Sequence, residues 1–417
     1  MAATTRRAGA GAAVAAAAVM LAAAPLARAS SFDVIYGFAG GLDGGSPHVT
    51  VDGNGNILGV GQSAGKRTAG AVSSYGTAFA IAPATGLTTL HVFQGPPDGA
   101  NPRDVVADPQ GNLYGASFGG PNSCAIASCG ELFKIAPGST TVQRLHAFKG
   151  GSVDGAAPTA IALDAAGNIY GVTYAGGNEG CYQRWGCGTV FTLTAAGTYH
   201  VLYRFFDGAD GANPDGNVVI DAAGNVYGTA SDGANGQGLV FKVSPAGAFT
   251  VLHAFTGGAD GAAPNGLVLD AAGTLYGAAF WGGANKAGLI YKIDSSGAFS
   301  VAYNFQNKRD GGGPGGRLAI DPSGTIYGTA EYGGSSAQAN YCANAVALNT
   351  FGCGVLFALN AAGSLSVIHA FSGGADGGTP NGIVRSADGH LVGATASGGA
   401  RPGSGYVIGG TIYQATP

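Results

Sequence analysis

The chain has 417 residues, with 19 Lys and Arg against 23 Asp and Glu and a formal net charge of −4. This balance, without any basic cluster, argues against nucleic acid and anionic membrane surfaces as partners. Because 78 residues are Gly while 46% of the chain is hydrophobic, the composition argues against disorder and favours a turn-rich all-β protein.

Residues 1–29 have the three parts of a secretory signal peptide. Arg6 and Arg7 give a positive start, an Ala-rich apolar run follows, and Ala27-Arg28-Ala29 supplies small residues at the cleavage site. An uncleaved membrane anchor is the alternative, and it is disfavoured because the run is only weakly hydrophobic. Ser30 stands where a lipoprotein needs Cys, and no later segment is long and apolar enough for membrane insertion. We therefore expect a secreted protein, extracellular or periplasmic.

Seven Asp-Gly-x-x-Pro segments divide the rest of the chain into copies of one repeat. The segments are Asp43 to Pro47, Asp98 to Pro102, Asp154 to Pro158, Asp210 to Pro214, Asp260 to Pro264, Asp310 to Pro314 and Asp376 to Pro380. Successive Asp residues are 55, 56, 56, 50, 50 and 66 positions apart. A period of this kind indicates a tandem-repeat architecture.

Each repeat is predicted to form a four-stranded antiparallel meander, which the fifth copy shows most clearly. Its runs of β-branched and aromatic residues cover 265–270, 274–280, 288–293 and 298–305, and each run is bounded by Gly, Asp, Asn or Pro. No helical period is visible, so the runs are interpreted as strands a, b, c and d. An Asp-x-x-Gly turn joins strand a to strand b in six copies, and Ser386 replaces the Asp in the seventh.

One such sheet has two apolar faces that it cannot bury alone. Aromatic residues recur on strands b and c, so stacking the sheets around an axis would bury their rings between neighbours. We predict an all-β, seven-bladed β-propeller that forms a single domain at residues 30–417, in preference to an open β-solenoid. Residues 32–38 form a lone d-type strand, and residues 410–414 end the chain on a c-type strand. Pairing these two strands would complete the last blade and close the ring.

Three segments carry a resemblance to a known family. They are Leu252 to Pro264 (LHAFTGGADGAAP), Gly224 to Thr229 (GNVYGT) and Leu239 to Val243 (LVFKV). With them the chain resembles the Gloeo/Verruco (GloVer) tandem-repeat family of secreted bacterial proteins along essentially its whole mature length. The resemblance implies export and a repeat architecture, often with a C-terminal sorting segment, and no established activity. Here the chain ends at Pro417, three residues after the last predicted strand, which puts surface anchoring in doubt.

The six Cys form three close pairs, and every pair lies in a b–c loop. The pairs are Cys124 with Cys129, Cys181 with Cys187, and Cys342 with Cys353. Six Cys allow fifteen connectivities, and we favour these three local disulfides because export favours oxidation. Metal binding is the alternative, disfavoured because no pair has His or a second Cys pair at finger-like spacing.

The b–c and d–a loops leave the sheets on one face, which carries the long Cys-bearing loops and all the Asp-Gly-x-x-Pro segments. Variable, rigid loops on a repeated scaffold are a usual position for recognition, so we predict ligand binding on this face. The candidate residues are Trp281, Trp185, Arg184, Tyr174, Tyr332 and Phe118. Aromatic rings with polar neighbours suit a glycan or a protein ligand, and the alternative is that these rings only pack the loop bases.

Repeated polar residues are interpreted as structural. The seven Asp of the Asp-Gly-x-x-Pro segments could form a Ca²⁺ ring, but Asp before Gly is an ordinary turn cap, so no cofactor and no metal are expected. Four His share one position on strand d and are interpreted as a packing solution; they are His91, His146, His253 and His369. No catalytic residue is predicted, since no Ser-His-Asp order or His-metal spacing stands out.

Two functions stay open at this point. The favoured one is a monomeric, non-catalytic binding module for an extracellular glycan or protein. The alternative is a hydrolase or lyase that uses groups of the same face, namely Asp232, Glu331, Arg184 and Arg317. Non-repeated ionisable groups that converge at the channel mouth would favour the enzyme.

Overall fold

The fold is described from a computed structural model of the chain. The residues described are 1, 31–39, 43–63, 67–68, 71–72, 75–82, 86–124, 129–178, 180–181, 185–233, 235–334, 352–399 and 409–417. All regular secondary structure among them is β-strand, as the composition predicts. The proposed signal sequence lies outside this range apart from Met1.

The strands form consecutive four-stranded antiparallel meanders in chain order. The first contains β2 (Gly45–Val51), β3 (Ile57–Ser63), β6 (Thr77–Ala82) and β7 (Gly86–Val92), beside a two-stranded ribbon of β4 (Arg67–Thr68) and β5 (Ala71–Val72). The next contains β8 (Ala100–Ala107), β9 (Leu113–Gly119), β10 (Glu131–Ile135) and β11 (Gln143–Ala147). Then come β12 (Gly155–Leu163), β13 (Ile169–Gly176), β14 (Thr189–Leu193) and β15 (Tyr199–Arg204).

The second half of the chain repeats this arrangement. One meander contains β16 (Ala212–Pro214), β17 (Val219–Ile220), β18 (Val226–Asp232), β19 (Leu239–Val243) and β20 (Phe249–Ala254), with β16 and β17 as a split strand a. The next contains β21 (Ala262–Leu269), β22 (Leu275–Trp281), β23 (Leu289–Ile293) and β24 (Phe299–Asn304). It is followed by β25 (Gly312–Ile320), β26 (Ile326–Tyr332), β27 (Val355–Leu359) and β28 (Leu365–Ala370). The last strands are β29 (Gly378–Arg385), β30 (Leu391–Ser397) and β31 (Thr411–Thr416).

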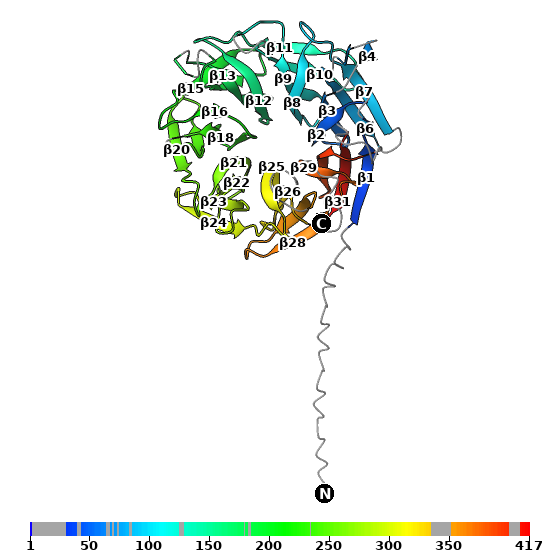
Figure 1. The fold of residues 1–417 in the computed structure, drawn as a ribbon, viewed down its shortest axis with the longest axis vertical. Coiled ribbons are helices and arrows are strands. Elements are labelled where there is room, and N and C mark those ends of the chain that lie inside the picture. The colour runs from blue at the N-terminus through cyan, green and yellow to red at the C-terminus, as the bar shows by residue number, and fades with distance from the viewer. Residues whose placement is uncertain are drawn as a thin grey trace.

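The two ends of the chain meet in one sheet. Strand β1 (Ser31–Gly37) pairs antiparallel with β31, from Ser31 opposite Thr416 to Gly37 opposite Thr411. A single parallel bridge, Arg317 opposite Gly382, links β25 to β29. Figure 1 shows the sheets following one another around a common centre, with strand a of each sheet innermost. The fold is therefore propeller-like.

The a–b turns have the chemistry predicted from their sequence. In the first of them, Asp52 Oδ1 accepts hydrogen bonds at 2.9 Å from the backbone N–H groups of Asn54 and Asn56. Gly55 adopts a φ of 82°, which reverses the chain at little steric cost. Where Ser386 replaces the Asp, its hydroxyl donates to the carbonyl oxygen of His390 at 3.0 Å instead.

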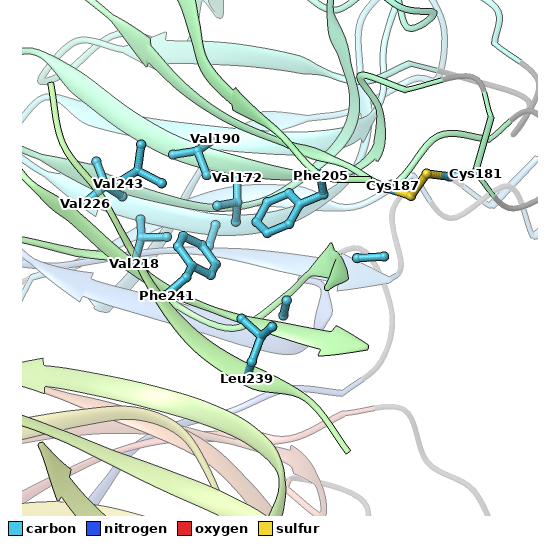
Figure 2. Close-up of a cluster of buried hydrophobic side chains, with 13 residues drawn as sticks. Val172, Cys181, Cys187, Val190, Phe205, Val218, Val226, Leu239, Phe241 and Val243 are labelled. Carbon is cyan, nitrogen blue, oxygen red and sulfur yellow. A yellow bond between two sulfur atoms is a disulfide. The ribbon is translucent and has the colours of Figure 1, made fainter. Parts of the chain in front are cut away.

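Neighbouring sheets pack through aromatic and aliphatic side chains. Figure 2 shows one such cluster, in which Val172 and Val190 of one sheet pack with Val218 and Phe241 of the next. Within a sheet, the strand-b Gly makes room for the strand-c ring; a Cβ on Gly115 would lie 2.1 Å from the ring of Phe133. These contacts leave little freedom at strand-b and strand-c positions, so the repeat is tightly constrained there.

Candidate functional site

A cavity of about 450 Å³ lies at the centre of the ring of sheets. Its walls come from the first residues of the a strands and the last residues of the b strands, including Arg103 and Asn381 from strand a and Ser231 from strand b. The d–a segments lead into those a strands and the b–c loops leave those b strands. The cavity therefore lies at the end of the ring that carries the predicted ligand-binding face.

Two register positions of the cavity wall differ among the repeats. The residue after the repeated Pro of strand a lines the cavity in every copy, and these residues are His48, Arg103, Thr159, Asp215, Asn265, Gly315 and Asn381. The sixth residue of strand b also changes from copy to copy, and its cavity-lining members are Gln62, Ser231, Phe280 and Glu331. The preceding Pro and the strand-b Gly are unchanged in all seven copies.

One ion pair crosses the channel. Arg317 of β25 donates from one guanidinium nitrogen to both carboxylate oxygens of Asp104 of β8, at 2.7 and 2.8 Å. Asp104 also accepts the backbone N–H groups of Val105 and Ile161, each at 2.9 Å. The two charges neutralise each other and tie together sheets that are not neighbours. Arg317, a candidate in the enzyme hypothesis, is thus already occupied by a carboxylate.

Glu331 differs from the other charged residues of the cavity. Burial raises the pKa of its carboxyl to about 7. Across the described part of the chain, no hydrogen bond or ion pair is formed by this carboxylate. At neutral pH it is therefore divided between the protonated and ionised forms without a charged partner.

His48 and Arg103 form a more polar side of the cavity. Nε2 of His48 lies 3.0 Å from Nε2 of Gln62. Burial lowers the pKa of His48; Asp104 opposes this effect, whereas Arg317 and Arg103 reinforce it, so the imidazole is neutral at pH 7. The guanidinium of Arg103 lies 5.4 Å from the ring centre of Phe118.

The predicted aromatic residues have different surroundings. Trp281 and Trp185 are 40% and 50% exposed, and Tyr174 is 37% exposed. Tyr332 is only 2% exposed, and its ring packs against Gly312 and Gly313. Its surroundings therefore agree with the alternative that these rings pack the base of a loop. Arg184 lies outside the described residues.

Trp281 and Tyr332 form a cluster with Phe280, a loop aromatic that is not among the six predicted ligand-binding residues. The ring centres of Phe280 and Trp281 are 4.6 Å apart, and those of Phe280 and Tyr332 are 6.0 Å apart. Phe280 lines the cavity, whereas Trp281 extends to the surface. The cluster thus connects the cavity to the predicted loop face.

The seven repeated Asp are engaged within their own turns. Each accepts a strand-d side chain, with His in four copies and Tyr in three; these residues are His91, His146, His253, His369, Tyr36, Tyr203 and Tyr303, at 2.9 to 3.3 Å. Each Asp also accepts a backbone N–H of the d–a turn, such as that of Gln94 on Asp98 at 2.9 Å. The four His therefore have a hydrogen-bonding role as well as a packing one.

Two of the predicted disulfides are present. Cys124 is bonded to Cys129 and Cys181 to Cys187. Cys353 is also disulfide-bonded, and its predicted partner Cys342 lies outside the described residues. Among the described residues there is no group of three or more His, Cys, Asp or Glu placed to hold a metal ion. In the same part of the chain, no helix has the length and hydrophobicity needed to cross a membrane.

Sequence reasoning missed most of the cavity residues because it looked for residues that recur. The signal that could have found them is the opposite one, namely a register that follows an invariant Pro and carries six different residue types in the seven copies. His48, Thr159 and Asp215 occupy one such register, although they are more than fifty residues apart in sequence. Glu331 was predicted only as one of the groups of the enzyme hypothesis, and its place in the cavity beside Gly315 was not foreseen.

The repeat, the meanders and their arrangement around a centre define a propeller-like tandem-repeat protein. The chain belongs to the Gloeobacter/Verrucomicrobia repeat family, whose model matches residues 24–185, 69–265, 182–348 and 229–417. No curated protein matches the chain.

Solved structures give a likeness of fold. The extracellular domain of a one-component system from B. thetaiotaomicron is 9% identical, with 91% of this chain and 39% of that chain covered and a TM-score of 0.51. A gluconolactonase from Xanthomonas campestris is 14% identical, with 74% and 82% covered and a TM-score of 0.42. A luciferin-regenerating enzyme is 12% identical, with 76% and 91% covered and a TM-score of 0.46. Of these three, only the first exceeds a TM-score of 0.5, and at its identity it supports the fold alone.

Proposed function

We propose that this chain is a secreted, seven-bladed propeller, closed by β1, that binds a glycan in its central cavity without catalysing a reaction. The observation that carries the proposal is the variation of the cavity wall. The Pro of strand a and the Gly of strand b repeat in every copy, whereas the cavity-lining residues at the two variable register positions differ in combination from copy to copy. Such asymmetry on a symmetric scaffold is expected where one particular ligand is recognised.

The size and chemistry of the cavity suit a small polar ligand. Its volume of about 450 Å³ lies within the usual range for small-molecule sites. Amide, hydroxyl and charged groups line it, together with the ring of Phe280. A sugar ring has polar edges and an apolar face, so it can use both kinds of surface. A protein ligand, the other partner considered, would need a larger contact surface outside the cavity, where Trp185 and Trp281 are exposed.

Secretion is supported by the disulfides. Two are present in b–c loops, and disulfides persist mainly in oxidising compartments. The pairing of β1 with β31 supports a closed ring, because β1 supplies the fourth strand of the last sheet and covers the edge of β31.

A glycan array on the purified mature protein tests the proposal, with two variants that add the same ring at opposite ends of the molecule. Ser231 lines the cavity and is exposed, so Ser231→Trp would obstruct it. Ser295 is exposed in a c–d turn on the other face, so Ser295→Trp is the matched control. We expect the first variant to lose glycan binding and the second to keep it. Absence of any glycan signal, or equal binding by both variants, would refute a glycan site in the cavity.

The second candidate is a hydrolase or lyase, favoured by the carboxyl of Glu331. A group whose pKa is near 7 can both donate and accept a proton at neutral pH. Mass spectrometry of a bound oligosaccharide after incubation would show cleavage products if the protein is an enzyme. Unchanged oligosaccharide after long incubation with excess protein would exclude this alternative for that ligand.

A further inference from the structure

One register position of the cavity wall lacks a side chain. Gly315 stands where the other copies carry His, Arg, Thr, Asp or Asn. A Cβ built on it would have three nearest neighbours, namely Oε1 of Glu331 at 3.7 Å, the ring of Phe280 at 3.7 Å and the amide nitrogen of Asn265 at 3.8 Å. The missing side chain therefore leaves a notch bounded by a carboxylate, an aromatic ring and an amide, which we call the Gly315 notch.

The Gly315 notch contains a carboxylate without a cation. Arg317 is bound to Asp104 at 2.7 Å, and Arg103 lies against the ring of Phe118. Neither guanidinium therefore neutralises Glu331, and desolvation is the cause of its raised pKa. A carboxylate held in this way gains from any ligand group that donates a charged hydrogen bond.

The other two walls restrict what such a ligand can be. Phe280 offers an apolar ring edge, backed by Trp281 at 4.6 Å between ring centres. The side-chain oxygen of Asn265 is buried and has no hydrogen-bond partner among the described residues. The ligand therefore needs an apolar face, a cationic donor and at least one further donor close together.

We infer that the Gly315 notch is a subsite for an amino sugar, with the sugar's ammonium group on Glu331, its apolar face on Phe280 and a hydroxyl on Asn265. The inference rests on the proposed function, since it names the class of glycan that the cavity takes. A neutral sugar can fill the same space, but it leaves the carboxylate without a counter-charge. Preference for the amine is therefore the property that distinguishes this subsite.

Two trisaccharides that differ only in acetylation test the inference. One is the β-1,4-linked glucosamine trimer, which is cationic, and the other is its fully N-acetylated, uncharged form. Each is titrated into the disulfide-intact protein at pH 7, and binding is measured by calorimetry. We expect wild-type protein to bind the amine form about tenfold or more tightly than the acetylated form, as for one charge-assisted hydrogen bond. Glu331→Gln should abolish that preference.

Gly315→Ala tests the notch itself. The added Cβ meets its neighbours at ordinary contact distances, so the variant should fold while a ligand loses space, and binding should weaken at least fivefold. The matched control is Gly258→Ala, at a position that does not line the cavity. A Cβ added there would have Thr256 Oγ1 as its nearest atom at 3.5 Å, so this variant should bind like wild type.

The outcomes separate this inference from the proposed function. Equal binding of both trimers, or an amine preference that survives Glu331→Gln, overturns the amino-sugar subsite. If neither trimer binds while the array finds other glycans whose binding Ser231→Trp abolishes, the inference is wrong and the proposed function stands. If no glycan binds at all, both are wrong.

Discussion

Replacing Glu331 by Gln should stabilise the protein above neutral pH. The folded carboxyl has a pKa of about 7 against an ordinary value of 4.5, so between these values the folded protein holds a proton that the unfolded chain has released. The free energy of unfolding of the wild type therefore falls as pH rises through this window and is constant above it. Gln resembles the neutral acid in shape and does not titrate, so the variant lacks this fall.

The magnitude follows from the pKa difference. At about 1.4 kcal/mol per pKa unit, the ionised carboxylate costs at most about 3.5 kcal/mol, and solvent contact in the open cavity reduces this to roughly 1–3 kcal/mol. Urea unfolding at pH 4, 6 and 8, followed by Trp fluorescence, measures the effect. The variant should match wild type at pH 4 and exceed it at pH 8.

A control variant excludes a general charge effect. Asp33 is exposed on β1, far from the cavity in sequence and structure, so Asp33→Asn should stay within about 0.5 kcal/mol of wild type at each pH. A Glu331→Gln protein that is no more stable than wild type at pH 8 would show that the carboxylate is solvated or paired. The argument for a ligand cation would then lose its basis.

Three further predictions concern the scaffold. Burial acts to raise the pKa of Asp376, but hydrogen bonds from His369 and Ser372 prevail and lower this pKa. The stability that the Asp376 carboxylate contributes is therefore present above about pH 4 and is lost as pH falls through the folded pKa. Asp376→Asn should therefore lower the free energy of unfolding by about 1–2 kcal/mol at pH 7 and by less at pH 3, as measured by urea unfolding; an equal loss at both pH values would contradict this. Replacing Cys181 and Cys187 by Ser should cost about 2 kcal/mol in thermal unfolding, and a larger loss of glycan binding than of stability would show that the loop itself contacts the ligand. Gly115→Ala would place a Cβ 2.1 Å from the Phe133 ring and should destabilise by about 1–3 kcal/mol or more, whereas a neutral result would contradict the close packing of strands b and c.

The repeated part of the architecture could be predicted because its causes are local. Asp52 and Gly55 specify a turn within four residues, and the strand-b Gly is paired with a strand-c ring in the same repeat. The turn Asp occurs in six copies and the strand-b Gly in all seven, so a copy with a weaker signal, such as the one with Ser386, can be interpreted from the others. The pairing of β1 with β31 followed from counting strand types at the two ends.

The cavity could not be predicted in the same way, because its contacts join distant repeats. Arg317 and Asp104 are 213 residues apart, and nothing in either local sequence specifies the other. The His and Tyr partners of the repeated Asp were also missed. They alternate between two residue types that share a hydrogen-bonding group and a ring, so only geometry shows that they are equivalent.

Variation at the cavity wall has a second explanation, which is that channel-facing residues drift because no neighbouring sheet packs against them. Drift predicts side chains that are individually harmless to stability, and Thr159 or Asn381 would fit that description. Glu331 does not, because a half-buried, unpaired carboxylate with a raised pKa is expected to destabilise the folded protein once it ionises. Gly315 leaves it beside an open notch, where a larger polar residue could have hydrogen-bonded to it. A residue that weakens the fold while facing a cavity is expected where binding requires it, since single substitutions to Gln or Ala would remove the penalty.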